Sequence, residues 1–118
     1  MADVVYFARD MLFTSKIREV ARTLGVTVEG ARDAAALARA AVGARLVLLD
    51  LRLEGALDVL AALAADPALR GVRSVGFVDH EKIDVMAAAR ARGCSEVLTK
   101  GQFSRDLPRL LAPSPPLP

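Results

Sequence analysis

The sequence predicts an α/β fold in which a five-stranded parallel sheet carries helices on both faces. Five short apolar runs alternate along the chain with five segments of helical periodicity, and the connections between them are a few residues long. The run LVLLD at 46–50 is apolar on both faces, which is typical of a central parallel strand. Because crossovers between parallel strands are right-handed, such units place their helices on both sides of the sheet.

The first unit begins with DVVYF at 3–7, a β-branched and aromatic run that predicts a buried strand. Thr14 or Ser15 can cap the helix that follows, since a hydroxyl accepts a hydrogen bond from a free backbone N–H. Apolar residues keep helical spacing as far as Leu24, and Gly25 ends the helix.

The second and third units lead to the centre of the sheet. VTVEG at 26–30 alternates as a brief strand, and Asp33 then caps an alanine-rich helix that runs to about Val42. The central strand at 46–50 is followed by a helix over 56–65, with a proline and a glycine just beyond it.

The fourth unit is the strand SVGFV at 74–78 and a helix that starts at Asp79 or His80, runs to Arg92 and ends at Gly93.

The fifth unit is the strand EVLT at 96–99 and a last helix within SRDLPRLL at 104–111. Pro108 stands near the first turn of that helix, where its missing N–H is tolerated.

Length and composition fit one globular domain over 1–112 with a proline-rich, flexible tail at 113–118. The chain has 118 residues, of which 53% are hydrophobic and 25% charged. A net charge of +2 is too balanced to indicate nucleic acid or membrane as a direct partner. The single cysteine, Cys94, excludes an internal disulfide, and no apolar run approaches the roughly 20 residues that span a bilayer. We therefore expect a cytoplasmic protein.

In parallel sheets of this kind, ligands and chemistry collect beyond the carboxyl ends of the strands. The candidate functional residues are therefore those that follow each strand. They are Ala8, Arg9, Asp10, Asp50, Val78, Asp79, His80, Thr99 and Lys100.

LVLLDLRLEG, with Asp50 ending the third strand, and GCSEVLTKGQF, with Lys100 after the fifth, resemble the receiver domain of bacterial response regulators. The resemblance covers nearly the whole chain and implies a flavodoxin-like (βα)5 fold with strand order 2-1-3-4-5. It implies that Asp50 is the phospho-acceptor position and that a histidine kinase supplies the phosphoryl group. It also implies that Lys100 pairs with the phosphoryl group.

Other positions depart from the receiver pattern. Ala8 and Arg9 stand where receivers have an acidic pair that holds Mg²⁺, and only Asp10 remains nearby. Val78 stands where the fourth strand of a receiver ends in Thr or Ser, and Val97 where its fifth strand has an aromatic residue. These departures indicate a divergent member, a pseudo-receiver.

Phosphoryl transfer to a carboxylate needs Mg²⁺ to neutralise the developing charge, and Mg²⁺ needs hard oxygen ligands. Asp50 and Asp10 would make a thin site, and the permanent cation of Arg9 would repel the metal. We therefore expect no metal or other cofactor, with Arg9, Lys100 or both neutralising Asp50. If the domain is phosphorylated after all, Asp10 and Asp50 are the expected Mg²⁺ ligands.

Three residues have simpler interpretations. His80 is expected at a helix cap or on the surface, because no nucleophile is placed beside it by sequence. Cys94 is expected to be a small, half-buried residue without a redox partner. Asp79 either caps a helix or adds a carboxylate to the site-lining group of Arg9, Asp10, Val78 and Lys100.

Met11, Leu12 and Phe13 form an apolar cluster directly after the first strand. The simpler interpretation is a hydrophobic staple for the first helix. The alternative is an apolar lid over the old phosphorylation pocket or a patch for a partner.

Three functions follow from these observations. The first is a receiver-like signalling module, not an enzyme, that acts by protein–protein contact or self-association through about Glu81–Leu111 without phosphorylation. The second is a phospho-accepting receiver of a two-component system that uses Asp50. The third is a small flavodoxin-like protein that binds a nucleotide or flavin, although no glycine-rich loop opens any expected helix.

Overall fold

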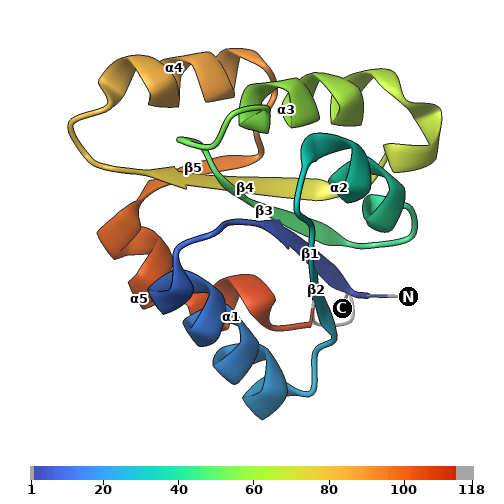
Figure 1. Ribbon diagram of the computed structural model, residues 1–118, viewed down its shortest axis with the longest axis vertical. Helices are drawn as coiled ribbons and strands as arrows, with labels where there is room; N and C mark the ends of the chain where they lie inside the picture. Colours follow the sequence, from blue (N-terminus) through green and yellow to red (C-terminus); the bar gives the residue numbers. More distant parts are fainter. Residues whose placement is uncertain (1, 114–118) are drawn as a thin grey trace, which may run out of the picture.

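The computed structural model describes residues 2–113 as a parallel sheet between two layers of helices (Figure 1). The strand order is β2-β1-β3-β4-β5, and every neighbouring pair is parallel. Helices α1 and α5 cover one face, and α2, α3 and α4 cover the other. The elements are β1 (Val4–Phe7), α1 (Met11–Leu24), β2 (Val28–Gly30), α2 (Ala34–Ala41), β3 (Leu46–Asp50), α3 (Ala56–Ala65), the 3₁₀ helix η1 (Pro67–Leu69), β4 (Arg73–Val78), α4 (Ile83–Ala91), β5 (Glu96–Thr99) and α5 (Lys100–Leu111).

The expected fold class and strand order are confirmed, and three elements have the expected bounds: β3, α3 and β5. Two expected boundaries also hold for the stated reason. Gly25 ends α1 in the left-handed region (φ 71°), which a glycine adopts without strain. Asp33 caps α2 by accepting a hydrogen bond from the Ala36 N–H.

The start of α1 differs from the prediction. The helix begins at Met11 and not after Thr14 or Ser15, because the Asp10 carboxylate accepts a hydrogen bond from the Leu12 N–H and caps the chain there. Asp10, Thr14 and Ser15 are all residue types that cap helices, so composition alone does not choose among them. The extra turn carries Phe13 onto the core.

The starts of α4 and α5 also differ. Helix α4 begins at Ile83 and not at Asp79 or His80, since the Asp79 side chain pairs with other residues. Helix α5 begins at Lys100, where Thr99 and Gln102 exchange hydrogen bonds as a capping box.

The expectation for Pro108 is therefore wrong. This residue lies in the interior of α5, since the capping box starts the helix well before it.

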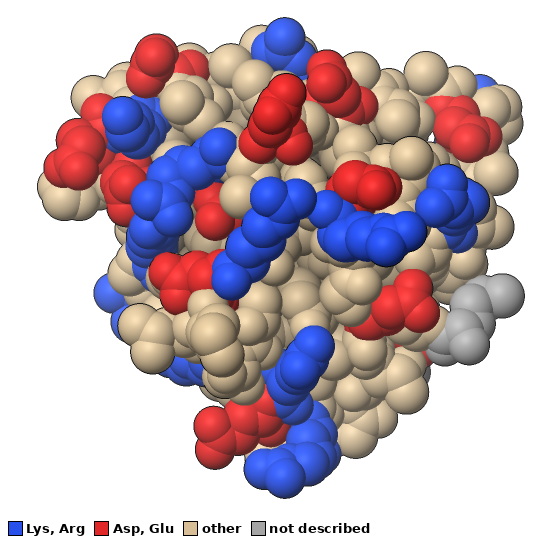
Figure 2. Space-filling model, in the orientation of Figure 1, with Lys and Arg blue, Asp and Glu red and all other residues tan. Residues whose placement is uncertain are grey.

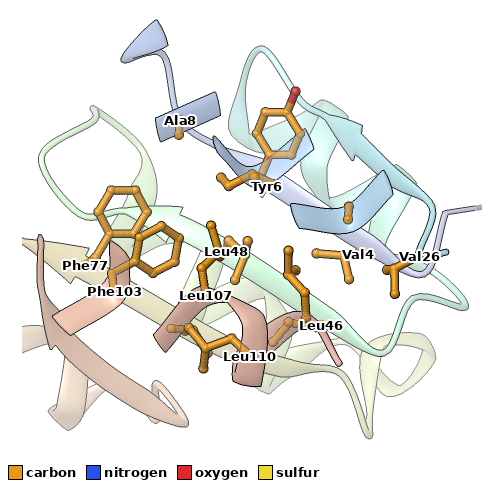
Figure 3. Packing of buried hydrophobic residues seen from close by; sticks show 14 residues of the cluster. Val4, Tyr6, Ala8, Val26, Leu46, Leu48, Phe77, Phe103, Leu107 and Leu110 are labelled. Atoms are coloured by element: carbon orange, nitrogen blue, oxygen red, sulfur yellow. The ribbon is translucent and has the colours of Figure 1, made fainter. Parts of the chain in front are cut away.

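Buried aliphatic and aromatic side chains fill both spaces between sheet and helices. On the α1 and α5 side, shown in Figure 3, Leu48 and Leu107 pack in the centre. Phe77 of β4 stacks on Phe103 of α5, with ring centroids 4.1 Å apart. Each buried side chain of this size stabilises the fold by about 1.5–3 kcal/mol, so these two layers hold the strand ends in place.

No helix among residues 2–113 is both long and apolar enough to cross a membrane. The expected flexible tail, 113–118, lies outside the described residues except for Pro113.

Candidate functional site

Asp50 ends β3 at the carboxyl edge of the sheet, opposite Phe77 in the register of β4. It is one of two buried polar residues in the described chain and is 2% exposed. Its Oδ1 accepts a hydrogen bond from the Arg52 N–H at 3.1 Å, which closes a turn between strand and loop. A buried carboxylate needs such partners, because leaving water costs it free energy.

Arg52 supplies the positive charge nearest to Asp50. Its Nε lies 3.7 Å from Asp50 Oδ1, and its Nη1 lies 3.6 Å from Asp79 Oδ2. The guanidinium therefore bridges the carboxylate of Asp50, which ends β3, and that of Asp79, which follows β4. The arginine is partly exposed, so its contribution is electrostatic balance rather than a strong buried bond.

Lys100 pairs with Asp79 at the other side of this group. The Lys100 Nζ lies 3.1 Å from Asp79 Oδ1. The hydrogen bond from Lys100 is the largest of the effects that hold the pKa of Asp79 below its ordinary value, and the charges of Lys100, Arg52 and Lys82 add to it. The carboxylate of Asp79 thus stays ionised between two cations.

Arg9 and Asp10 both turn to backbone partners. The Arg9 Nη2 donates to the Arg32 carbonyl oxygen at 2.9 Å, toward the end of β2. The Asp10 carboxylate accepts from the Leu12 N–H at 2.9 Å and caps α1. The prediction that Arg9 or Lys100 pairs with Asp50 is therefore wrong: Arg52 takes that place, and Lys100 pairs with Asp79.

Apolar side chains border this charged group. Val78 is fully buried in the core on the α3 and α4 side. Phe13 packs on Phe77 and Phe103, with ring centroids 5.2 Å and 6.0 Å apart. The Lys100 ammonium lies 5.8 Å from the centre of the Phe13 ring, within cation–π range.

Met11 and Leu12 do not join Phe13 on the core. They are 79% and 82% exposed at the start of α1, so the expected hydrophobic staple is wrong for these two residues.

Thr99, His80 and Cys94 have partners other than Asp50. Thr99 caps α5 through its hydroxyl, and the predicted role of His80 as a surface residue is confirmed, with its side chain 82% exposed. Cys94 is half-buried as expected, and burial raises the pKa of its thiol. Its Sγ donates to the carbonyl oxygens of Ser74 and Glu96, so the thiol is held within the β4–β5 layer.

Four paired side chains at the carboxyl edge balance one another in charge. Asp50 and Asp79 supply two negative charges, and Arg52 and Lys100 supply two positive ones. Acidic and basic side chains alternate on this side of the molecule, at the left of Figure 2. Within residues 2–113, no three side chains of the types His, Cys, Asp and Glu gather as metal ligands do. Mg²⁺ is usually held by one or two carboxylates together with waters and phosphate oxygens, and here both carboxylates of the group are paired with cations.

Arg52 is the residue that sequence reasoning missed. A signal for it was present, since it stands two positions after Asp50, in the loop that leaves the strand. An aspartate at such a strand end accepts the N–H two residues on, which brings residue 52 against the carboxylate. The direction of the long arginine side chain, by contrast, depends on Asp79 of a neighbouring strand.

No family model and no curated protein matches this chain. Solved structures do, over most of both chains. The receiver domain of NtrX from Brucella abortus is 22% identical, with a TM-score of 0.72 over 89% of this chain and 91% of that one. The phosphorylated cyanobacterial phytochrome response regulator RcpA is 20% identical, with a TM-score of 0.73 over 92% and 91%. The chemotaxis response regulator CheY4 of Vibrio cholerae is 16% identical, with a TM-score of 0.76 over 92% and 94%. The chain has the fold of response-regulator receiver domains.

Proposed function

We propose that this chain is a receiver-fold signalling module that acts by contact with another protein and does not depend on phosphorylation of Asp50. The observation that carries the proposal is the charge-balanced group at the carboxyl edge. There Asp50 is already held by Arg52, and Lys100 by Asp79. On this account the domain is a signalling module and not an enzyme.

The chemistry of acyl phosphate formation supports the proposal that Asp50 is not phosphorylated. The attacking carboxylate must approach phosphorus while positive charge and Mg²⁺ neutralise the equatorial oxygens. Asp50 is buried and its Oδ1 is engaged by the N–H and the guanidinium of Arg52. The second carboxylate that could help hold a metal, Asp10, caps α1 instead. Binding Mg²⁺ would thus require Asp10 to leave its helix cap and Asp50 to accept the metal while Arg52 lies against it.

The surface from about Glu81 to Leu111 is the proposed partner face. It comprises α4, β5 and α5 and contains Ile83, which is 73% exposed at the start of α4. A large exposed aliphatic residue loses unfavourable hydration when a partner covers it. The partner is another protein or a second copy of this chain.

Site-specific crosslinking in the cells that produce the protein tests this proposal. A photo-crosslinking phenylalanine derivative replaces Ile83, and the matched control places it at Val42, which is 45% exposed at the end of α2. We expect one discrete adduct from position 83, none from position 42, and the same position-83 adduct in an Asp50→Asn background. Loss of the adduct in Asp50→Asn, or equal adducts at both positions, contradicts the proposal.

A phosphorylatable receiver is the second candidate function. The observation that favours it is the position of Asp50, which ends β3 at the carboxyl edge with Lys100 at the start of α5 nearby. This alternative requires Asp10 to leave its cap and bind Mg²⁺ with Asp50. Calorimetric titration with Mg²⁺ separates the two: an affinity of millimolar or better in wild type that disappears in Asp50→Asn supports the alternative.

A further inference from the structure

A second group of basic side chains lines a shallow, open cavity of about 330 Å³ beside β1 and β2. Its polar side chains are three arginines and two hydroxyl residues: Arg9, Arg18, Arg32, Thr14 and Tyr6. Among residues 2–113, no Asp or Glu lines it, and neither do the four charged residues of the Asp50 group. Basic side chains gather across the middle of the visible face in Figure 2, with acidic ones between them, over the region of β1 and β2. The charged side chains that line the cavity itself are thus all basic.

Contacts inside the fold hold two of the three guanidinium groups in position. The Arg9 Nη2 donates to the Arg32 carbonyl oxygen, and the Arg18 Nε donates to the Tyr6 hydroxyl, each at 2.9 Å. A guanidinium has five N–H donors, so each of these contacts occupies only one. Within residues 2–113, none of the three arginines has a carboxylate within 4.0 Å. The cavity therefore has positioned donors and no internal anion.

The Tyr6 hydroxyl is itself fixed by close packing against Gly30. A Cβ atom at position 30 would lie 2.8 Å from Cζ of the Tyr6 ring, closer than real contacts allow. Tyr6 is 3% exposed, so the ring cannot swing away without losing its place in the core. The glycine lets β2 lie against the ring, and the ring in turn sets the position of Arg18.

We propose that this cavity binds the phosphate group of a small phosphorylated molecule. Planar guanidinium groups match phosphate oxygens with paired, charge-assisted hydrogen bonds, and three of them balance a phosphate dianion better than a carboxylate. Because the cavity is open to solvent, it can hold a phosphate group while the rest of the molecule stays outside it. The proposal does not depend on the fate of Asp50.

The test is a titration of the isotope-labelled protein with inorganic phosphate, followed by NMR at constant ionic strength, with acetate as the comparison anion. We expect saturable shifts at the backbone and arginine Nε signals of residues 9, 18 and 32 with phosphate and not with acetate. Arg32→Gln should weaken phosphate binding roughly fivefold, since it removes one charge-assisted donor. The Arg9 contact survives this substitution, because it reaches the backbone carbonyl of residue 32.

Two control variants separate this site from other sources of anion binding. Arg70→Gln removes the same charge from an exposed residue after η1, and Lys100→Gln removes a cation from the Asp50 group. Both should bind phosphate as wild type does. Equal weakening by Arg70→Gln and Arg32→Gln, loss of binding in Lys100→Gln, or no saturation in wild type overturns the proposal.

Further arms with adenosine 5′-monophosphate and glucose 6-phosphate distinguish a nucleotide from a sugar phosphate as the ligand. Tighter binding of either one than of inorganic phosphate, lost in Arg32→Gln, supports the site and identifies the class. If neither binds at concentrations where phosphate saturates, the site does not accept a substituted phosphate and the proposal fails.

Discussion

Lys100 lies at the start of α5 with its Nζ 3.1 Å from Asp79 Oδ1, so the lysine pairs with the aspartate that follows β4. Arg52 connects the same aspartate to Asp50. Four charged side chains from three strand ends thus neutralise one another at the carboxyl edge of the sheet.

The pairing of Asp79 makes stability depend on pH in the acid range. Its folded-state pKa lies below the ordinary value of 3.8, so its stabilising effect is complete above that value and is lost as pH falls through the folded pKa. We expect wild type to be more stable than Asp79→Asn at pH 6, with the difference shrinking below about pH 3.8. Urea unfolding at a series of pH values measures both.

A double-mutant cycle provides the control for this pH dependence. In a Lys100→Gln background the largest cause of the lowered pKa is absent, so the Asp79→Asn substitution should lose most of its pH-dependent effect on stability. If Lys100 is kept, an effect of Asp79→Asn on the free energy of unfolding that stays constant from pH 6 to pH 2.5 would show that the pair does not stabilise the folded state.

Asp10 is expected to act as a helix cap and not as a metal ligand. Asp10→Ala should lower the free energy of unfolding by about 1 kcal/mol, whereas Asp10→Asn should change it little because asparagine also caps helices. The same values should be obtained with Mg²⁺ and with a chelator. A loss in Asp10→Asn that appears only when Mg²⁺ is present would assign the carboxylate to a metal site.

Phe13 and Leu12 form a matched pair on α1. Phe13 packs on Phe77 and Phe103, so Phe13→Ala should cost about 2 kcal/mol of unfolding free energy. Leu12 is exposed, and Leu12→Ala should stay within about 0.5 kcal/mol of wild type. Chemical denaturation of both variants checks this, and a large cost at Leu12 would mean that it is buried in solution.

Gly76 in β4 leaves room for Leu51. A Cβ at position 76 would lie 2.9 Å from the Cγ and both Cδ atoms of this buried leucine, so Gly76→Ala should destabilise the fold by about 1–3 kcal/mol. Gly101 in α5 has open space at that point, and Gly101→Ala should be neutral or stabilise by up to about 1 kcal/mol. Equal thermal midpoints for the two variants would disprove this difference.

The sheet and Asp50 were predictable from sequence because their signal is local. LVLLD is apolar on both faces and ends in a carboxylate, so the strand bounds and the position of Asp50 follow from the run itself. Glycine and aspartate at helix ends, as at Gly25 and Asp33, are equally local signals.

The contacts at the site were not predictable because they depend on neighbouring strands. Sequence places Arg9 and Arg52 in loops at the same edge of the sheet, and the turn at Asp50 indicates only where the backbone of residue 52 lies. In the fold, Arg9 is drawn to a carbonyl beyond β2, and Arg52 is fixed by Asp79 beyond β4. Long side chains find such partners only when the strands are in place.

Intact mass spectrometry shows directly whether Asp50 accepts a phosphoryl group. Wild type and Asp50→Asn are incubated with acetyl phosphate and Mg²⁺, beside a receiver domain that is phosphorylated under the same conditions. We expect an unchanged mass for both forms of this chain while the comparison receiver gains one phosphoryl group. A phosphoryl adduct on wild type that is absent from Asp50→Asn would contradict it.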